Sequence, residues 1–192
     1  MSRRANFDLL VGATGAGKST FLLQNVVKPL QEKGNRILVV KNDINKDWGD
    51  VPFFDFYDEI KTFEGIRKLN YLDGRFEIIQ KNYSNGALIL EDCRGYIDLQ
   101  SDKIMQWLLI FRRHVGIDLF AVFHGLTEVP PKFFTHADRL ILFSTNDNIN
   151  KRSKEIYSDK LKLIDEARLR IEDKVRKGNK YAYEIVNLDI RL

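Results

Sequence analysis

Short apolar runs alternate with longer segments of helical periodicity along this chain of 192 residues. The runs have the length and composition of strands buried on both faces of a parallel sheet, and the segments between them suit the helical connections of such a sheet. Strands are predicted at residues 7–11, 36–41, 87–92, 118–123, 139–144 and 181–188. The pattern therefore predicts an α/β fold with a mostly parallel central sheet flanked by helices.

The sequence predicts the positions of the helices less clearly than those of the strands. The first begins near Thr20, is kinked or shortened by Pro29 and ends at Gly34. Further helices are predicted at residues 58–69, 132–137 and 151–177. Residues 70–86 are ambiguous, with a short strand at 75–79 as one interpretation and a turn at Asn85-Gly86.

Another helix is capped by Ser101 or Asp102 and runs to about Val115, with Gly116 as its stop. One face of it is expected to be buried. That face consists of Ile104, Trp107, Leu108, Phe111 and Val115.

One stretch of eight residues carries the clearest chemical signal. It reads Gly12-Ala13-Thr14-Gly15-Ala16-Gly17-Lys18-Ser19, the pattern of a phosphate-binding loop. A predicted strand precedes it and a predicted helix follows it, which is the order that such a loop requires. The alternative is a glycine turn that only joins a strand to a helix, and the agreement of both flanks argues against it.

The chemistry of this loop suits a nucleoside triphosphate. Its glycines let backbone N–H groups turn toward a phosphate, and the following helix adds the positive end of its dipole. We expect residues 12–20, Thr20 included, to bind ATP. Lys18 would reach the outer phosphates, and the Ser19 hydroxyl would bind Mg²⁺.

Two acids end the strand predicted at residues 87–92. Glu91 and Asp92 stand at its carboxyl end, where a parallel sheet delivers side chains to a phosphate-binding loop. One acid would hold Mg²⁺ through a coordinated water, and the other would polarise the water that attacks the γ-phosphate. We assign Glu91 together with Ser19 to the metal, but which acid takes which role stays open. The alternative is a strand that ends in two solvated acids.

Three further polar residues flank the strand predicted at residues 118–123. His124 ends it and would sense the γ-phosphate or orient water, unless it is a structural histidine. Arg112 and Arg113 precede it at a helix end, where a functional role and a simple response to the helix dipole are both open. A strand of this kind after the acid-bearing one is typical of RecA-like ATPases. Nucleotide kinases and GTPases lack it.

Composition and charge refine this picture. With 44% hydrophobic and 30% charged residues, the chain has the composition of one globular domain, divided into a RecA-like core at 1–150 and a basic helix and strand at 151–192. Residues 151–180 hold eleven Lys and Arg against six acids, whereas the rest of the chain has 20 against 21. This excess favours a polyanionic partner or a neighbouring subunit, although a solvated helix face is an equal alternative.

Other features narrow the class of protein. Cys93 is the single cysteine, which excludes an internal disulfide, and we expect it to be a core residue without chemistry.

No apolar run approaches the roughly 20 residues of a membrane-spanning helix. We therefore expect no membrane insertion and a cytoplasmic protein. An aromatic loop at 42–58 would lie over the nucleotide, face a neighbouring subunit or pack onto its own domain.

The stretch at residues 111–124, together with residues 12–19 and 87–92, resembles the HerA/FtsK superfamily of P-loop ATPases. The compact size is similar to that of the genome-packaging ATPases of membrane-containing viruses within it. The resemblance implies a RecA-like core, a ring that is usually hexameric, and ATP-driven translocation of DNA, which we expect to be double-stranded. Capsid or portal-vertex proteins are further candidate partners, and the location would then be the host cytoplasm or the virion.

The resemblance also carries over single residues. Lys18 and Ser19 match the phosphate and Mg²⁺ positions, and Arg112 or Arg113 matches the arginine that is offered to a neighbouring subunit's nucleotide. Two departures stand out. The family has Asp then Glu where this chain has Glu91 then Asp92, and it has Gln or Asn where this chain has His124.

The sequence thus predicts an ATPase that translocates DNA, acting as a viral packaging motor. Three other functions stay open: an ATPase for virion extrusion or secretion, a small-molecule phosphotransferase, and a nucleotide-dependent switch. No motif places a pore loop.

Overall fold

The computed structural model describes residues 5–41, 48–54, 57–70, 75–95, 103–147 and 158–189. Its seven strands form a mostly parallel sheet flanked by helices, which confirms the predicted fold class. The chain groups into two compact units. The first unit comprises Met1–Asn6 with Ser19–Phe120, and the second comprises Phe7–Lys18 with Ala121–Leu192. The division into a core at 1–150 and a C-terminal part at 151–192 stays a prediction.

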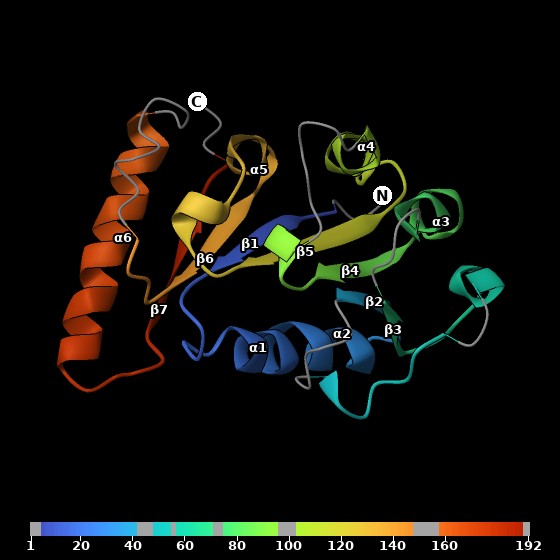
Figure 1. Cartoon of the computed structure of the whole chain (residues 1–192), viewed down its shortest axis with the longest axis horizontal. Coiled ribbons are helices and arrows are strands. Elements are labelled where there is room, and N and C mark those ends of the chain that lie inside the picture. The colour runs from blue at the N-terminus through green and yellow to red at the C-terminus, as the bar shows by residue number, and fades with distance from the viewer. Residues whose placement is uncertain are drawn as a thin grey trace. The chain divides into compact units, whose positions relative to one another are not determined.

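In the first unit the strands follow the order β3 (Ile66–Asn70), β2 (Arg36–Lys41), β4 (Gly86–Leu90) and β5 (Ile117–Phe123). β2 pairs in parallel with β3 and β4. Every residue of β4 and β5 is buried, as expected for strands covered on both faces. Helical segments cover both sides of these strands, with α1 and α2 on one side and α3 and α4 on the other (Figure 1).

The first helical segment is continuous but changes its winding. It consists of α1 (Lys18–Phe21), a π-helical stretch (Leu22–Val27) and α2 (Lys28–Glu32). The predicted disturbance by Pro29 takes the form of this wider turn, because the ring and missing N–H of proline disfavour a regular α-helix just before it. The helix nevertheless continues through Pro29, and Gly34 follows its end with φ +70°.

Two predictions between β2 and β4 are wrong. The helix predicted at 58–69 is a 3₁₀ segment, η3 (Tyr57–Lys61), followed by β3, because Gly65 adopts φ +70° and Ile66–Asn70 pairs with β2. The strand interpretation of 75–79 is also wrong, since α3 (Arg75–Asn82) occupies that segment. Phe76 and Ile78 alternate as in a strand, whereas Phe76 and Ile79 have the spacing of a helix, so a segment of five residues fits both. The structure buries Phe76 and Ile79.

The helix predicted to end near Val115 is shorter and buries another face. α4 (Lys103–Phe111) buries Met105, Leu108 and Leu109, followed in the same helical period by Arg112. The sequence did not reveal this period, because the charged Arg112 stands at one of its buried positions. Phe111, which was expected to be buried, is 42% exposed. The predicted caps Ser101 and Asp102 lie outside the described residues.

The second unit contains the remaining strands. β1 (Phe7–Val11) is parallel to β6 (Arg139–Phe143), and β7 (Tyr183–Asn187) is antiparallel to β6. Phe133 of α5 (Pro131–His136) packs edge-on against Phe7 and Phe123, with ring centroids 5.4 and 5.5 Å apart. This aromatic cluster ties the start of β1, the strand that leads into the phosphate-binding loop, to Phe123, the residue before His124.

The last helix, α6 (Ser158–Arg176), packs against β7. Ile164, Ala167 and Ile171 are buried, and Gly178 follows the helix end with φ +95°. The predicted start of this helix, 151–157, lies outside the described residues.

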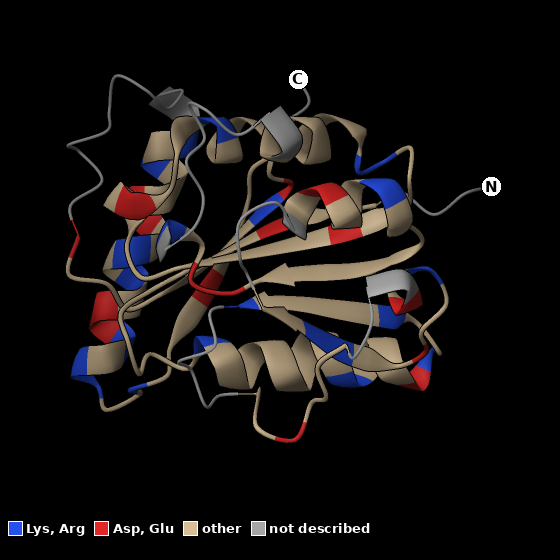
Figure 2. Ribbon diagram, turned by 45° about the vertical axis from the view of Figure 1, so that its right-hand side comes forward, with Lys and Arg blue, Asp and Glu red and all other residues tan. Residues whose placement is uncertain are grey.

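The polar face of α6 does not form an uninterrupted positive stripe. Lys and Arg alternate with Asp and Glu along it (Figure 2). Ion pairs hold three of its basic residues and Lys177 directly after its end: Arg168 with Asp165 and Glu172, Arg170 and Lys174 with Glu184, and Lys177 with Asp173. Pairing within the unit weakens the case for α6 as a nucleic-acid surface.

Glu184 on β7 makes the stability of this unit depend on pH. Hydrogen bonds from Lys174 (2.5 Å) and Arg170 (3.1 Å) lower the pKa of its carboxyl. Its contribution to stability is therefore present above the ordinary glutamate range and is lost as the pH falls through the lowered pKa. We expect Glu184→Gln to reduce the free energy of unfolding by at most about 1 kcal/mol at pH 7. At pH 3 the difference from the native protein should be smaller, as measured by urea unfolding.

Glu166→Gln is the matched control, because Glu166 is an exposed acid on α6, the helix that carries Lys174 and Arg170. A loss that is as large at pH 3 as at pH 7 would show that Glu184 acts by packing and not by charge.

Candidate nucleotide site

The phosphate-binding loop joins β1 to α1. Two of its glycines have backbone angles that favour glycine, φ +76° at Gly15 and φ +101° at Gly17. Gly12 is required for space, because a Cβ on it would lie 2.5 Å from Cβ of Phe143. The loop is also tied to its unit by backbone hydrogen bonds, from Gly12 N to Phe123 O (3.2 Å) and from Ala13 N to Ser144 O (2.8 Å).

Lys18 is folded back into this loop. Its side chain is only 6% exposed, and Nζ donates hydrogen bonds to the carbonyl oxygens of Gly12 (2.6 Å) and Ala13 (3.1 Å). Thr14 and Gly15, at the tip of the loop, are exposed. A buried ammonium beneath an exposed, glycine-shaped backbone suits a phosphate group, which supplies the negative charge and the acceptor oxygens.

His124 meets the same loop from the end of β5. Its Nδ1 lies 3.3 Å from Oγ1 of Thr14 and 3.5 Å from Nζ of Lys18. Its backbone N–H donates to Oε2 of Glu128 (3.3 Å). The second unit therefore brings together three polar side chains that stand far apart in the sequence.

Asp147 supports the turn after His124, a role that the sequence did not indicate. Oδ2 of Asp147 accepts hydrogen bonds from the backbone N–H (3.2 Å) and the hydroxyl (3.1 Å) of Thr127. It packs so closely that a Cβ on Gly125 would lie 1.9 Å from it. The one feature of the sequence that could have pointed to it is Gly125, directly after His124, because a glycine often stands where another group packs against the backbone.

The two acids belong to the first unit and differ in environment. Glu91 is 7% exposed, and its Oε1 accepts a hydrogen bond from the indole Nε1 of Trp48 (3.1 Å). Asp92 is half-buried and adopts the left-handed conformation with φ +49°. Strain of this kind costs free energy and turns the chain sharply after β4.

Trp48 is the residue of the aromatic loop that matters most for Glu91. It is 3% exposed, so at this position packing onto its own unit is the correct interpretation. Lys68 on β3 holds it in place by donating from Nζ to its carbonyl oxygen (2.9 Å), and this Nζ also lies 4.6 Å from the centroid of Phe53. Residues 42–47, 55 and 56 of the loop lie outside the described residues.

The two arginines before β5 also differ. Arg112 is 2% exposed and donates from Nη1 to the carbonyl oxygen of Leu109 (2.9 Å). Arg113 is exposed and lines a hollow of about 480 Å³ together with His114, Asn85 and Asp118. Of the pair, Arg113 is the one that a neighbouring molecule could contact.

Among the residues that the structure describes, no group of three His, Cys, Asp or Glu could hold a metal by itself. Mg²⁺ is usually held by one or two protein oxygens and the phosphates of its substrate. Ser19, the residue after Lys18, is half-buried and could supply one such oxygen.

Within the described parts of the chain, no helix is both long and apolar enough to span a membrane. Cys93 is buried, as predicted, and its Sγ lies 3.2 Å from the carbonyl oxygen of Leu90.

Comparison with known proteins gives no match to a family model or to a curated protein. Solved structures do match. The genome packaging NTPase B204 from Sulfolobus turreted icosahedral virus 2, in complex with AMP, is 18% identical, with 96% of this chain and 94% of that one covered at a TM-score of 0.73. The chain therefore has the fold of a viral genome-packaging ATPase.

Other structures agree with this packaging-ATPase fold. B204 from Sulfolobus Turreted Icosahedral Virus, the DNA-packaging ATPase, is 15% identical over 100% of this chain and 96% of that one, with a TM-score of 0.71. The conjugation coupling protein TcpA of pCW3, with ATPγS, is 13% identical over 81% of this chain and 52% of that one, with a TM-score of 0.55. These likenesses in fold agree with the P-loop ATPase fold that the resemblance implied. B204 was also solved with sulfate, ATPγS and AMPPCP, so that protein binds nucleotides.

Proposed function

We propose that this protein is an ATPase that couples hydrolysis to the translocation of double-stranded DNA. It would work as a viral genome-packaging motor, a ring of identical and most simply six subunits. The observation that carries the proposal is the contact of Lys18, Thr14 and His124 around one phosphate-binding loop. The structural neighbours that are packaging ATPases lend it support.

The chemistry follows from the charge that develops during phosphoryl transfer. Lys18 would neutralise the outer phosphates, and His124, 3.5 Å from it, would report whether the γ-phosphate is present. Mg²⁺, when bound with ATP, supplies further positive charge to the phosphates, with Ser19 and one of the two acids as its protein contacts. The other acid would orient the attacking water.

The site would be incomplete without a second copy of the chain. Arg113 is exposed, and it precedes β5 whereas His124 follows it, so the two stand at opposite ends of one strand about 20 Å long. We propose that Arg113 acts on the nucleotide of a neighbouring subunit. DNA, further subunits and capsid or portal-vertex proteins would then be the partners, in the host cytoplasm or in the virion.

Phosphate release from ATP tests this function. The purified protein is assayed over a range of protein concentrations with long double-stranded DNA, with single-stranded DNA and without DNA. Turnover per subunit should rise steeply with protein concentration and increase further with double-stranded DNA. Lys18→Ala gives the background rate, and Lys28→Ala, which changes an exposed lysine of α2, is the matched control. Slow turnover that depends neither on protein concentration nor on DNA would contradict the motor function and favour a nucleotide-dependent switch.

A further inference from the structure

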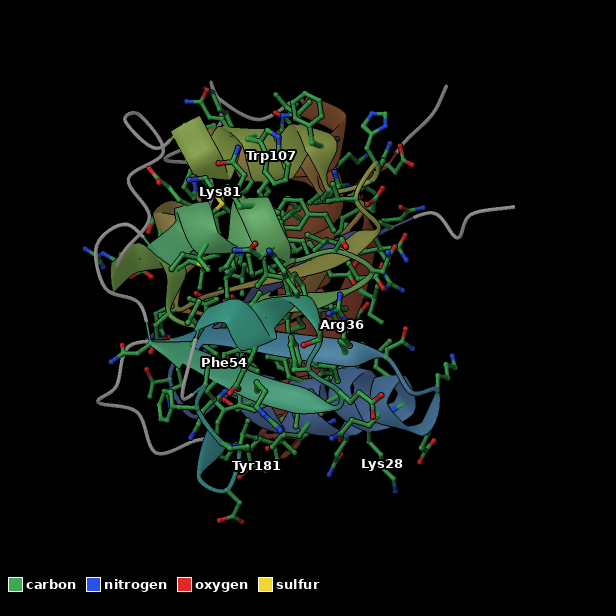
Figure 3. The ribbon with its side chains drawn as sticks, turned by 90° about the vertical axis from the view of Figure 1, so that its right-hand side faces the viewer. Lys28, Arg36, Phe54, Lys81, Trp107 and Tyr181 are labelled. Carbon is green, nitrogen blue, oxygen red and sulfur yellow. The ribbon has the colours of Figure 1, made fainter. Side chains whose placement is uncertain are left out.

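The turn between α6 and β7 returns to the phosphate-binding loop within the second unit (Figure 1). At the end of this turn, Tyr181 (labelled in Figure 3) is the side chain that a Cβ on Gly17 would meet. A Cβ on Gly17 would stand 3.2 Å from Cδ1 and 3.6 Å from Cβ of Tyr181. The residue before Lys18 is therefore covered by an aromatic ring from the far end of the chain.

This ring is unusually accessible. Tyr181 is 59% exposed, the largest exposed fraction among the large apolar side chains of the described residues. Tyr183, two residues later, instead lies 5.6 Å from the ring of Phe143. Folding alone thus explains the position of Tyr183, but it leaves most of the Tyr181 ring in water, at a free-energy cost that a ligand would remove.

The turn that carries Tyr181 is well held. Asn179 N donates to the carbonyl oxygen of Lys174 (3.0 Å), and Ala182 N donates to that of Asn179 (3.2 Å). Ala182 itself is 3% exposed. These bonds fix the backbone that carries the ring, so that a ligand would have less backbone freedom to remove on binding, which favours a binding platform.

We propose that Tyr181 is the platform on which the base of the bound nucleotide stacks. The inference rests on the proposed nucleotide site, because the loop under the ring would hold the phosphates and the base must lie beyond them. An exposed aromatic face beside that loop offers the stacking surface that every base can use. Nζ of Lys180, 5.7 Å from the centroid of Tyr181, places a positive charge over the ring.

Stacking of this kind would strengthen the binding of ligands that carry a base and would not change the binding of the phosphates alone. We therefore compare the binding of ATP and of inorganic tripolyphosphate by titration calorimetry. Tyr181→Ala should weaken ATP binding about 10-fold and leave tripolyphosphate binding unchanged. Tyr181→Phe keeps the aromatic face and should bind ATP like the native protein. Ile185→Ala, which changes an exposed residue of β7 that is 52% accessible, is the matched control.

The outcomes separate this inference from the proposed function. A native protein that binds neither ligand would overturn the nucleotide site and the inference with it. A native protein that binds ATP, together with a Tyr181→Ala variant that binds ATP equally well, would overturn the inference alone. An equal loss of ATP and tripolyphosphate in that variant would also overturn it, because Tyr181 would then only support the loop.

Discussion

Replacing Glu91 with Gln is expected to stop ATP turnover while ATP still binds. The amide has the shape of the carboxylate, and its oxygen can still accept the hydrogen bond from Nε1 of Trp48. Burial of the side chain is therefore retained, whereas the negative charge that would act on metal or water is lost. We expect phosphate release to fall about 10²- to 10⁴-fold, the usual range for a positioned acid or base. Equilibrium binding of ATP measured without Mg²⁺ should change little.

Asp92→Asn, measured alongside, assigns the roles of the two acids. Loss of hydrolysis with retained nucleotide binding identifies the residue that orients water, and loss of Mg²⁺-dependent ATP binding identifies the metal contact. Glu77→Gln is the matched control, because Glu77 is an exposed acid on α3. If turnover is unchanged in both Glu91→Gln and Asp92→Asn, neither acid takes part in hydrolysis.

Arg113→Ala should reduce turnover about 10³-fold without weakening ATP binding to the same subunit. An arginine supplied from a neighbour can contribute a factor of this size by neutralising charge in the transition state. The proposal that Arg113 acts across a subunit boundary makes a further prediction about mixtures. A subunit with Lys18→Ala cannot bind the phosphates but still offers Arg113, and a subunit with Arg113→Ala has the opposite defect.

Neither variant should hydrolyse ATP alone, and their mixture should recover activity measurable as phosphate release. Arg176→Ala, assayed without DNA, is the control for removing an exposed arginine. Arg112→Ala is expected to behave differently, lowering thermal stability because Arg112 is buried and bonded to Leu109. A mixture that stays inactive, although both variants assemble with native protein, would contradict catalysis in trans.

Strands covered on both faces were predictable because their apolar runs need no partner to be recognised. β1, β2, β5 and β6 lie within a residue of their predicted bounds. The loop at residues 12–19 joins β1 to α1 as predicted, because its glycines mark a turn locally. That this loop binds a phosphate stays a prediction.

β3 was missed for a different reason. Its sequence, Ile66-Arg67-Lys68-Leu69-Asn70, has a weak local preference, and pairing with β2 makes it a strand. The face of α4 was mistaken because Arg112 occupies a buried position, which only the surrounding packing makes acceptable.

The sequence by itself determined the fold class, the buried strands and the residues of the phosphate-binding loop, because each depends on neighbours along the chain. Only the tertiary structure decided that His124 contacts Lys18, that Trp48 holds Glu91 and that Tyr181 covers Gly17. These pairs are separated by more than forty residues, and no local pattern records which strand ends or turns will meet. Only the tertiary structure shows that Arg112 is buried and Arg113 exposed, since adjacent arginines are alike in sequence and differ only in what packs around them.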